Sequence, residues 1–189
     1  EGLPVHGGAW TTWTWYWQEL FERRPEEALR RLDDYPGDWI RTKIVARPKP
    51  LMRAAVFDLQ GRSAEARVEW QSALAQLEEA LVERPDDPRL HSSLGIVFAT
   101  LGRHEEAVLE GRVAIELLPI SKDAFYGIQY EVDLARILTM IGESEAAMDQ
   151  LDRLLRIPSW IAIPWIELDP LYEPLREHPR YQALVAPGN

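Results

Sequence analysis

The chain has 189 residues, 46% of them hydrophobic and 28% charged, with a formal net charge of −10. This much apolar material can fill the core of one sizeable domain, which excludes a disordered chain. The acidic balance argues against nucleic acids and anionic membrane surfaces as partners, because both attract basic proteins. No cysteine is present, so disulfides and thiolate metal sites are excluded.

The longest apolar stretch, residues 160–166, does not predict a membrane-inserted segment. It is interrupted by Pro164 and is far shorter than the ~20 residues that span a bilayer. Because the first residue is Glu1 rather than Met, we expect a processed or excised piece of a longer protein, with an effector domain upstream. The compartment stays open, with the cytoplasm favoured over the periplasm.

An aromatic helix is predicted after an irregular lead-in over residues 1–9. Trp10, Trp13 and Trp17 lie at helical spacing, with Trp15 on a neighbouring face. Either these rings pack on the rest of the chain, or they form an exposed surface for a partner or for the upstream domain. Tryptophan dominates interface hot spots, so both alternatives stay open.

A second helix is predicted from Glu26 to about Asp34, after Pro25. The next stretch, Trp39–Ala46, is short and ambiguous. Two prolines exclude the sequence Arg47-Pro-Lys-Pro from a regular helix, because each removes a backbone donor and favours extended geometry in the residue before it.

The segment from Leu51 to Glu83 predicts two helices separated by Gly61. Ser63 is the expected N-cap of the second helix. That helix is about seven residues longer than the second helix of a typical 34-residue helix-turn-helix repeat. Seven residues make nearly two turns, so its apolar stripe drifts by only about 20°. We therefore expect the helix to project past its neighbours as a ridge.

The clearest helix pair spans residues 85–119. Asp87 is the expected cap of its first helix, with Pro88 at the first helical position. Gly102 is expected to end that helix with a positive φ. Small residues, Gly95 and Ala107 among them, lie where the two helices should cross, which lets the backbones approach closely.

This unit resembles a tetratricopeptide repeat, whose pattern runs Leu-Gly, aromatic, Gly, Ala, a larger residue, Ala and Pro. Two positions depart from it: His91 replaces an aromatic residue and Gly111 replaces a large apolar one. The matching positions are Leu94, Gly95, Phe98, Gly102, Ala107, Ala114 and Pro119.

The same order recurs after a junction, residues 120–130, that is about six residues longer than usual for such repeats. Leu134, Ala135, Leu138 and Gly142 follow the pattern and predict a third repeat. The tail is rich in proline and bulky apolar residues, and an end repeat needs a cover over its apolar face. The expected cover comprises Trp160, Ile163, Trp165, Leu168, Leu171, Leu175 and Leu184.

The resemblance implies an all-α fold, a right-handed superhelix of helix-turn-helix repeats with a capping tail. We expect one domain, 1–189, with these parts: 10–47, a degenerate repeat or cap; 48–85, the repeat with the lengthened helix; 86–119, the best repeat; 120–158, the repeat after the long junction; and 159–189, the C-terminal cap. Residues 48–185 are also similar to the C-terminal region of bacterial multidomain signalling proteins, linked to cyclase, kinase or winged-helix effectors. That similarity implies a sensing or partner-binding arm.

No catalytic pattern emerges from the sequence. His104-Glu-Glu-Ala-Val lacks the second histidine of a zinc-peptidase helix, and the four histidines lie far apart. Nucleophile elbows, phosphate-binding loops and EF-hand patterns are missing as well. We therefore predict no catalytic residues, cofactor or metal, and no enzyme.

The remaining candidate is the groove that the first helices of tetratricopeptide repeats line. Arg89 and Arg136 could grip a peptide carboxylate by paired hydrogen bonds, or they could be solvated or paired within the chain. The clamp of chaperone-tail binders needs asparagine, and the only one here is Asn189. Mapping the family pattern places the groove residues at Leu51, Asp58, Arg89, Ser92, Ile96, Gln129, Arg136 and Thr139.

The leading hypothesis is a non-catalytic interaction module that binds a peptide or a partner helix in this groove. The alternative is a structural oligomerisation scaffold, including a homodimer. The Trp10–Trp17 cluster and the long helix over residues 63–83 motivate that alternative.

Overall fold

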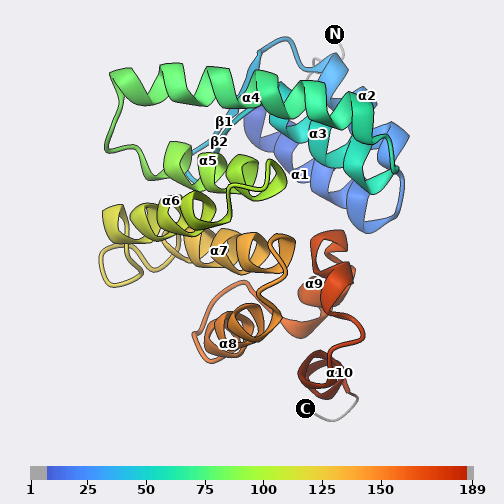
Figure 1. Cartoon of the computed structure of the whole chain (residues 1–189), viewed down its shortest axis with the longest axis vertical. Helices are drawn as coiled ribbons and strands as arrows, with labels where there is room; N and C mark the ends of the chain where they lie inside the picture. The colour runs from blue at the N-terminus through green and yellow to red at the C-terminus, as the bar shows by residue number, and fades with distance from the viewer. Residues whose placement is uncertain (1–7, 187–189) are drawn as a thin grey trace, which may run out of the picture.

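The computed structural model describes residues 8–186. Most of the expected lead-in, together with His6 and Asn189, therefore lies outside the described residues. The elements in chain order are α1 (Ala9–Phe21), α2 (Pro25–Asp34), β1 (Trp39–Arg41), β2 (Ala46–Pro48), α3 (Lys49–Leu59), α4 (Ser63–Glu83), α5 (Pro88–Thr100), α6 (His104–Leu117), α7 (Ile128–Met140), α8 (Ser144–Leu155), α9 (Ile163–Leu168), the 3₁₀ helix η1 (Pro170–Leu175) and α10 (Pro179–Val185) (Figure 1).

The fold is all-α, as the repeat pattern predicts, and consists of helical hairpins that pack side by side (Figure 1). Gly102 joins α5 to α6 with φ +77°, a conformation that side chains with a Cβ rarely adopt. Gly61 and Gly142 lie at the equivalent turns, with φ +71° and +82°. Asp87 caps α5 by accepting a hydrogen bond from the Arg89 backbone N–H.

The crossing of α5 and α6 depends on a missing side chain. A Cβ on Gly95 would lie 2.8 Å from Ile137 Cδ1 and 2.9 Å from the backbone oxygen of Ala107. Gly111 faces α7 instead, where a Cβ would lie 3.1 Å from both Ile137 Cδ1 and Leu134 Cδ1. The predicted close approach of the two backbones is therefore confirmed.

A short antiparallel ribbon interrupts the helices, where the sequence was ambiguous. Strands β1 and β2 pair Trp39 with Pro48 and Arg41 with Ala46. The proline-rich stretch is extended only as far as Pro48, because α3 begins at Lys49 and not at Leu51. Pro50 fits in the first turn, where no backbone N–H is needed for the helix.

Helix α4 has the predicted length of 21 residues, but the expectation about its N-cap is wrong. Ser63 is not an N-cap: it lies inside the first turn, and no side chain caps this end. The C-terminal turns of α4 extend past α3 (Figure 1). One side of α4 packs against β2, with Leu77 fully buried, whereas Val82 in the last turn is 84% exposed.

The tail packs on α7 and α8, although not through all the residues expected to cover them. Leu175 is fully buried, whereas Trp160 and Leu168 remain 39% and 48% exposed. Leu168 is the last residue of α9, and Trp160 lies in the irregular segment before that helix. The buried cover comprises Ile161, Ile166, Tyr172, Leu175 and Tyr181. Among the described helices, none is long and apolar enough to cross a membrane.

Candidate functional site

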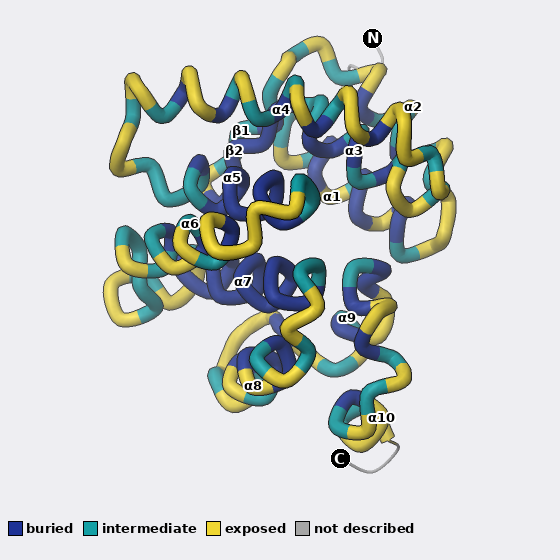
Figure 2. The backbone as a smooth tube through the Cα atoms, in the orientation of Figure 1, coloured by how far each residue is buried: buried dark blue, intermediate teal, exposed yellow. Residues whose placement is uncertain are grey.

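The face formed by α3, α5 and α7, here called the groove face, is largely covered by the chain itself. On α7, every residue from Ile128 to Thr139 is buried, and the helix is dark blue in Figure 2 except at its C-terminal end. Its neighbours are α5, α6, α8 and η1. An open groove along α7 is therefore absent from the described part of the chain.

Asp133 lies at the centre of this covered face. Its carboxylate accepts hydrogen bonds from Arg47 Nη2 of the ribbon at 2.9 Å and from Ser92 Oγ of α5 at 2.7 Å. Within α7 it also accepts from Gln129 Nε2 at 3.1 Å and from Arg136 Nη1 at 2.9 Å. These bonds satisfy a carboxylate that is only 1% exposed.

Arg136 extends the network to the tail. Its Nε and Nη2 donate to Asp169 Oδ2 at 3.1 and 2.9 Å. Its guanidinium also lies 4.3 Å from the ring centroid of Trp17 and 5.0 Å from that of Trp165. We call Arg47, Asp133, Arg136 and Asp169 the central ion cluster.

The two arginines and two aspartates of this cluster have formal charges that sum to zero. Burial by itself would raise the pKa of Asp133, but the Arg47 and Arg136 charges hold it below its ordinary value. Burial likewise opposes the charge on Arg136, yet Asp169 and Asp133 raise its pKa. Asp133 and Arg136 are therefore ionised near neutral pH, and each is paired with groups of opposite charge.

The predicted groove residues divide according to their surroundings. Arg89 pairs with Asp87 and donates to the Thr42 carbonyl, so both candidate carboxylate-gripping arginines bind partners within the chain. Thr139 donates to the Ala135 carbonyl one turn earlier. The structure brings Ser92, Gln129 and Arg136 together around Asp133, whereas Leu51, Asp58 and Ile96 line a separate cavity of about 430 Å³.

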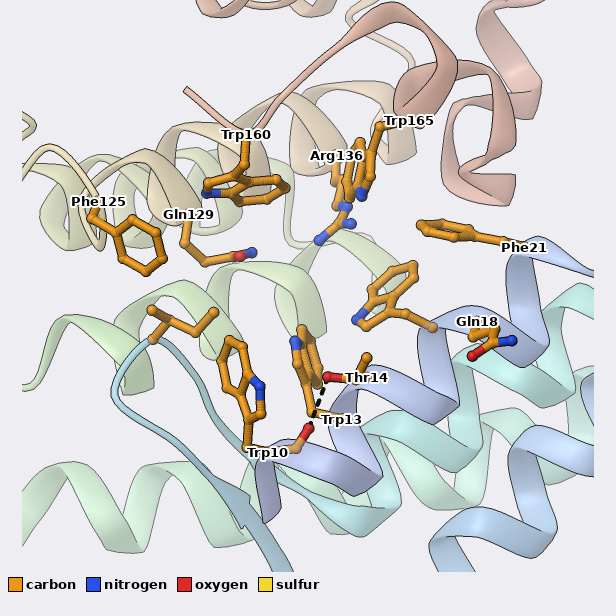
Figure 3. Close-up of a pocket in the computed structure, with 12 residues that line it drawn as sticks. Trp10, Trp13, Thr14, Gln18, Phe21, Phe125, Gln129, Arg136, Trp160 and Trp165 are labelled. Carbon is orange, nitrogen blue, oxygen red and sulfur yellow. Dashed lines mark hydrogen bonds between the residues drawn. The ribbon is translucent and has the colours of Figure 1, made fainter. Parts of the chain in front are cut away.

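A second cavity, of about 410 Å³, lies between α1, the start of α7 and the tail (Figure 3). We call it the tryptophan cavity. The lining is mostly aromatic, with a few polar side chains. It consists of Trp10, Trp13, Thr14, Trp17, Gln18, Phe21, Ile44, Phe125, Gln129, Arg136, Trp160 and Trp165.

The tryptophans of the N-terminal aromatic helix divide between buried and exposed positions. Trp13 and Trp17 are buried and pack edge to face with centroids 5.6 Å apart. Trp10 is 53% exposed and lies at the cavity. Trp15 lines neither cavity and stacks instead against Arg31.

Sequence reasoning missed the aromatic residues on the opposite wall. Trp160 and Trp165 pack edge to face with centroids 5.4 Å apart, and Phe21 of α1 meets Trp165 at 5.8 Å. Phe125, in the long junction, is 61% exposed. The two tryptophans of the tail are the available signal in the sequence, but their apolar surroundings predict core cover and not a cavity wall.

Metal chemistry finds no support in this part of the chain. Across residues 8–186, no group of three or more His, Cys, Asp or Glu side chains could hold a metal ion.

Comparison with known families identifies the repeat directly. Residues 59–119, from the end of α3 through α6, match the family model described as tetratricopeptide repeat. Comparisons with curated proteins and with solved structures found no match. The family match and the stacked hairpins support a tetratricopeptide repeat protein. Repeats of this kind generally mediate contacts between proteins, so a protein–protein interaction module is supported.

Proposed function

We propose that this module binds a peptide segment or helix of a partner protein at the tryptophan cavity, and not along an open groove. The observation that carries the proposal is the position of three exposed aromatic side chains. Trp10, Phe125 and Trp160 are 53%, 61% and 39% exposed, and all three line this one cavity. Aromatic residues around an apolar hollow are typical of protein-binding hot spots.

The cavity favours a bulky apolar side chain as the anchor of the partner. Its volume of about 410 Å³ lies within the range of ligand-binding pockets. The one charged residue in its lining, Arg136, is already paired with Asp133 and Asp169. A charged anchor would therefore lose its hydration without gaining a free counter-ion.

Charge argues for basic residues around that anchor. The chain carries a formal net charge of −10, which steers cationic segments toward its surface at physiological ionic strength. The proposed occupant is therefore a partner segment with one bulky apolar side chain between lysines or arginines.

The place of the module in a larger protein is a further part of the proposal. The lengthened α4, the long junction before α7 and the tail are the features on which the resemblance to bacterial signalling proteins is based. They support a regulatory arm attached to an effector domain, with the cytoplasm favoured as its compartment.

The test is a peptide array in which one large apolar residue lies between basic residues. Binders from the array are then measured by fluorescence anisotropy against Trp10→Ala and Trp160→Ala. Loss of a hot spot costs at least about 2 kcal/mol, so we expect affinity to fall by about 30-fold. Leu109→Ala is the matched control, because Leu109 is 58% exposed and does not line the cavity.

An array without binders, or binders indifferent to both tryptophan substitutions, would contradict the proposal. The competing function is a homodimeric scaffold, which the exposed Val68 and Val82 on α4 favour. Sedimentation would then show a dimer that Val82→Lys dissociates and Trp160→Ala leaves intact.

A further inference from the structure

Gln129 is the one buried uncharged polar side chain at the tryptophan cavity. It lies in the first turn of α7, is 3% exposed and contributes to the cavity wall. Figure 3 shows its amide directed into the space between Trp160 of the tail and Trp13 of α1. The two other uncharged polar residues of the lining, Thr14 and Gln18, are exposed.

The orientation of this amide is fixed by its neighbour. Gln129 Nε2 donates to Asp133 Oδ1 at 3.1 Å. Asp133 is held by Arg47 and Arg136, and an ionised carboxylate can only accept hydrogen bonds. Rotating the amide by 180° would place Gln129 Oε1 against that carboxylate. Gln129 Nε2 therefore keeps its hydrogen bond to Asp133, and Gln129 Oε1 receives no hydrogen bond.

Gln129 Oε1 is an acceptor without a donor. Among residues 8–186 it has no hydrogen-bond partner. It is also not one of the unpaired side-chain atoms that are fully shielded from solvent. Water can satisfy it while the cavity is open. An occupant that displaces this water must supply a donor, or the buried oxygen is left unpaired.

We propose, building on the function proposed above, that the cavity selects an aromatic anchor that carries an N–H donor, namely the indole of a partner tryptophan. Rings from α1 and from the tail lie on two sides of the cavity, which suits a flat aromatic occupant. The N–H of the indole meets Gln129 Oε1. An aliphatic anchor fills the space but leaves that oxygen unpaired.

Indole and benzofuran separate this inference from simple apolar binding. The two rings have the same shape, and only indole has an N–H. In ligand-observed NMR with the full chain, we expect indole to bind about tenfold tighter than benzofuran. In Gln129→Met, the ratio of the two affinities should fall to about one, while benzofuran affinity changes by less than about twofold.

Gln18→Met is the matched control. Gln18 also lines the cavity, but its amide donates to Glu22 on the exposed face of α1. This variant should keep the tenfold preference for indole. Thermal unfolding of both variants checks that the central ion cluster is intact, since Gln129 also donates to Asp133.

Equal binding of indole and benzofuran to the unsubstituted protein would overturn the inference, and so would a preference that survives in Gln129→Met. Failure of both probes to bind at millimolar concentration would also overturn it. In each case the peptide assay with Trp10→Ala and Trp160→Ala tests separately whether a partner segment binds at the tryptophan cavity.

Discussion

His91 shows how one departure from a repeat pattern acquires a physical role. The family has an aromatic residue at this position, and here the imidazole ring of His91 connects three segments of the chain. Nδ1 contacts Glu110 on α6, and Nε2 contacts the Pro85 carbonyl in the turn before α5. The hydrogen bond with Glu110 raises the pKa of His91, and the nearby Asp87 charge adds to it. The protonated ring therefore stabilises the α5–α6 hairpin.

Stability should depend on pH through this residue. Because the pKa is higher in the folded state, the stabilisation is complete below the unfolded value of about 6.5 and is lost as pH rises through the folded value. We expect the Tm of the unsubstituted chain to fall as pH rises above about 6.5. His91→Gln should remove that slope, and His104→Gln, at an exposed helix start, should keep it.

At the scale of elements, the helix crossings distinguish two glycines that look alike in sequence. Gly95→Ala places a methyl group 2.9 Å from the backbone oxygen of Ala107, which cannot move without shifting α6. Overpacking of this kind costs about 1–3 kcal/mol. Gly111→Ala meets only the ends of Leu134 and Ile137, which can adjust.

We therefore expect Gly111→Ala to stay within about 1 kcal/mol of the unsubstituted protein, since alanine also favours helix. Urea unfolding of both variants measures the difference. If Gly95→Ala were as stable as Gly111→Ala, the close approach at Gly95 would be wrong.

The hairpins were predictable because their signals are local. The turn glycines, the cap at Asp87 and the apolar spacing each concern neighbouring residues, and they gave the correct helix pairs. Ribbon strands of three residues are too short for periodicity to detect. The candidate cavity joins residues from α1, the junction and the tail. Spacing within one segment cannot reveal such a meeting, although Trp10, Trp13, Trp17, Gln129 and Arg136 were singled out individually.

Across the whole molecule, the central ion cluster holds three distant parts of the chain together. Arg47 comes from the ribbon, Asp133 and Arg136 from α7, and Asp169 from the tail. The side chains of all four are at most 5% exposed. Removing one member of such a pair leaves a buried charge without compensation, which is far more costly than losing an exposed pair.

Asp133→Asn should therefore destabilise the protein by about 3–5 kcal/mol. Glu65→Gln, which breaks the exposed pair with Arg62, should leave the stability almost unchanged, because solvent screens that pair. Because the pKa of Asp133 is lowered in the folded state, its contribution is present above the unfolded value of about 3.9 and is lost as pH falls below it. Urea unfolding at pH 7 and pH 3 measures both effects, and equal costs for the two variants would contradict the prediction.

Repeat proteins commonly tolerate the exchange, duplication or deletion of whole units, because each unit touches only the next. This chain is not modular in that sense. The counter-ions of α7 come from 86 positions earlier and 33 positions later in the sequence. A consensus repeat in place of α7 and α8 would leave the buried Arg47 and Asp169 without their counter-ions. Chimaeras built by exchanging single repeats should therefore misfold unless the ribbon and the tail are transferred together with α7 and α8.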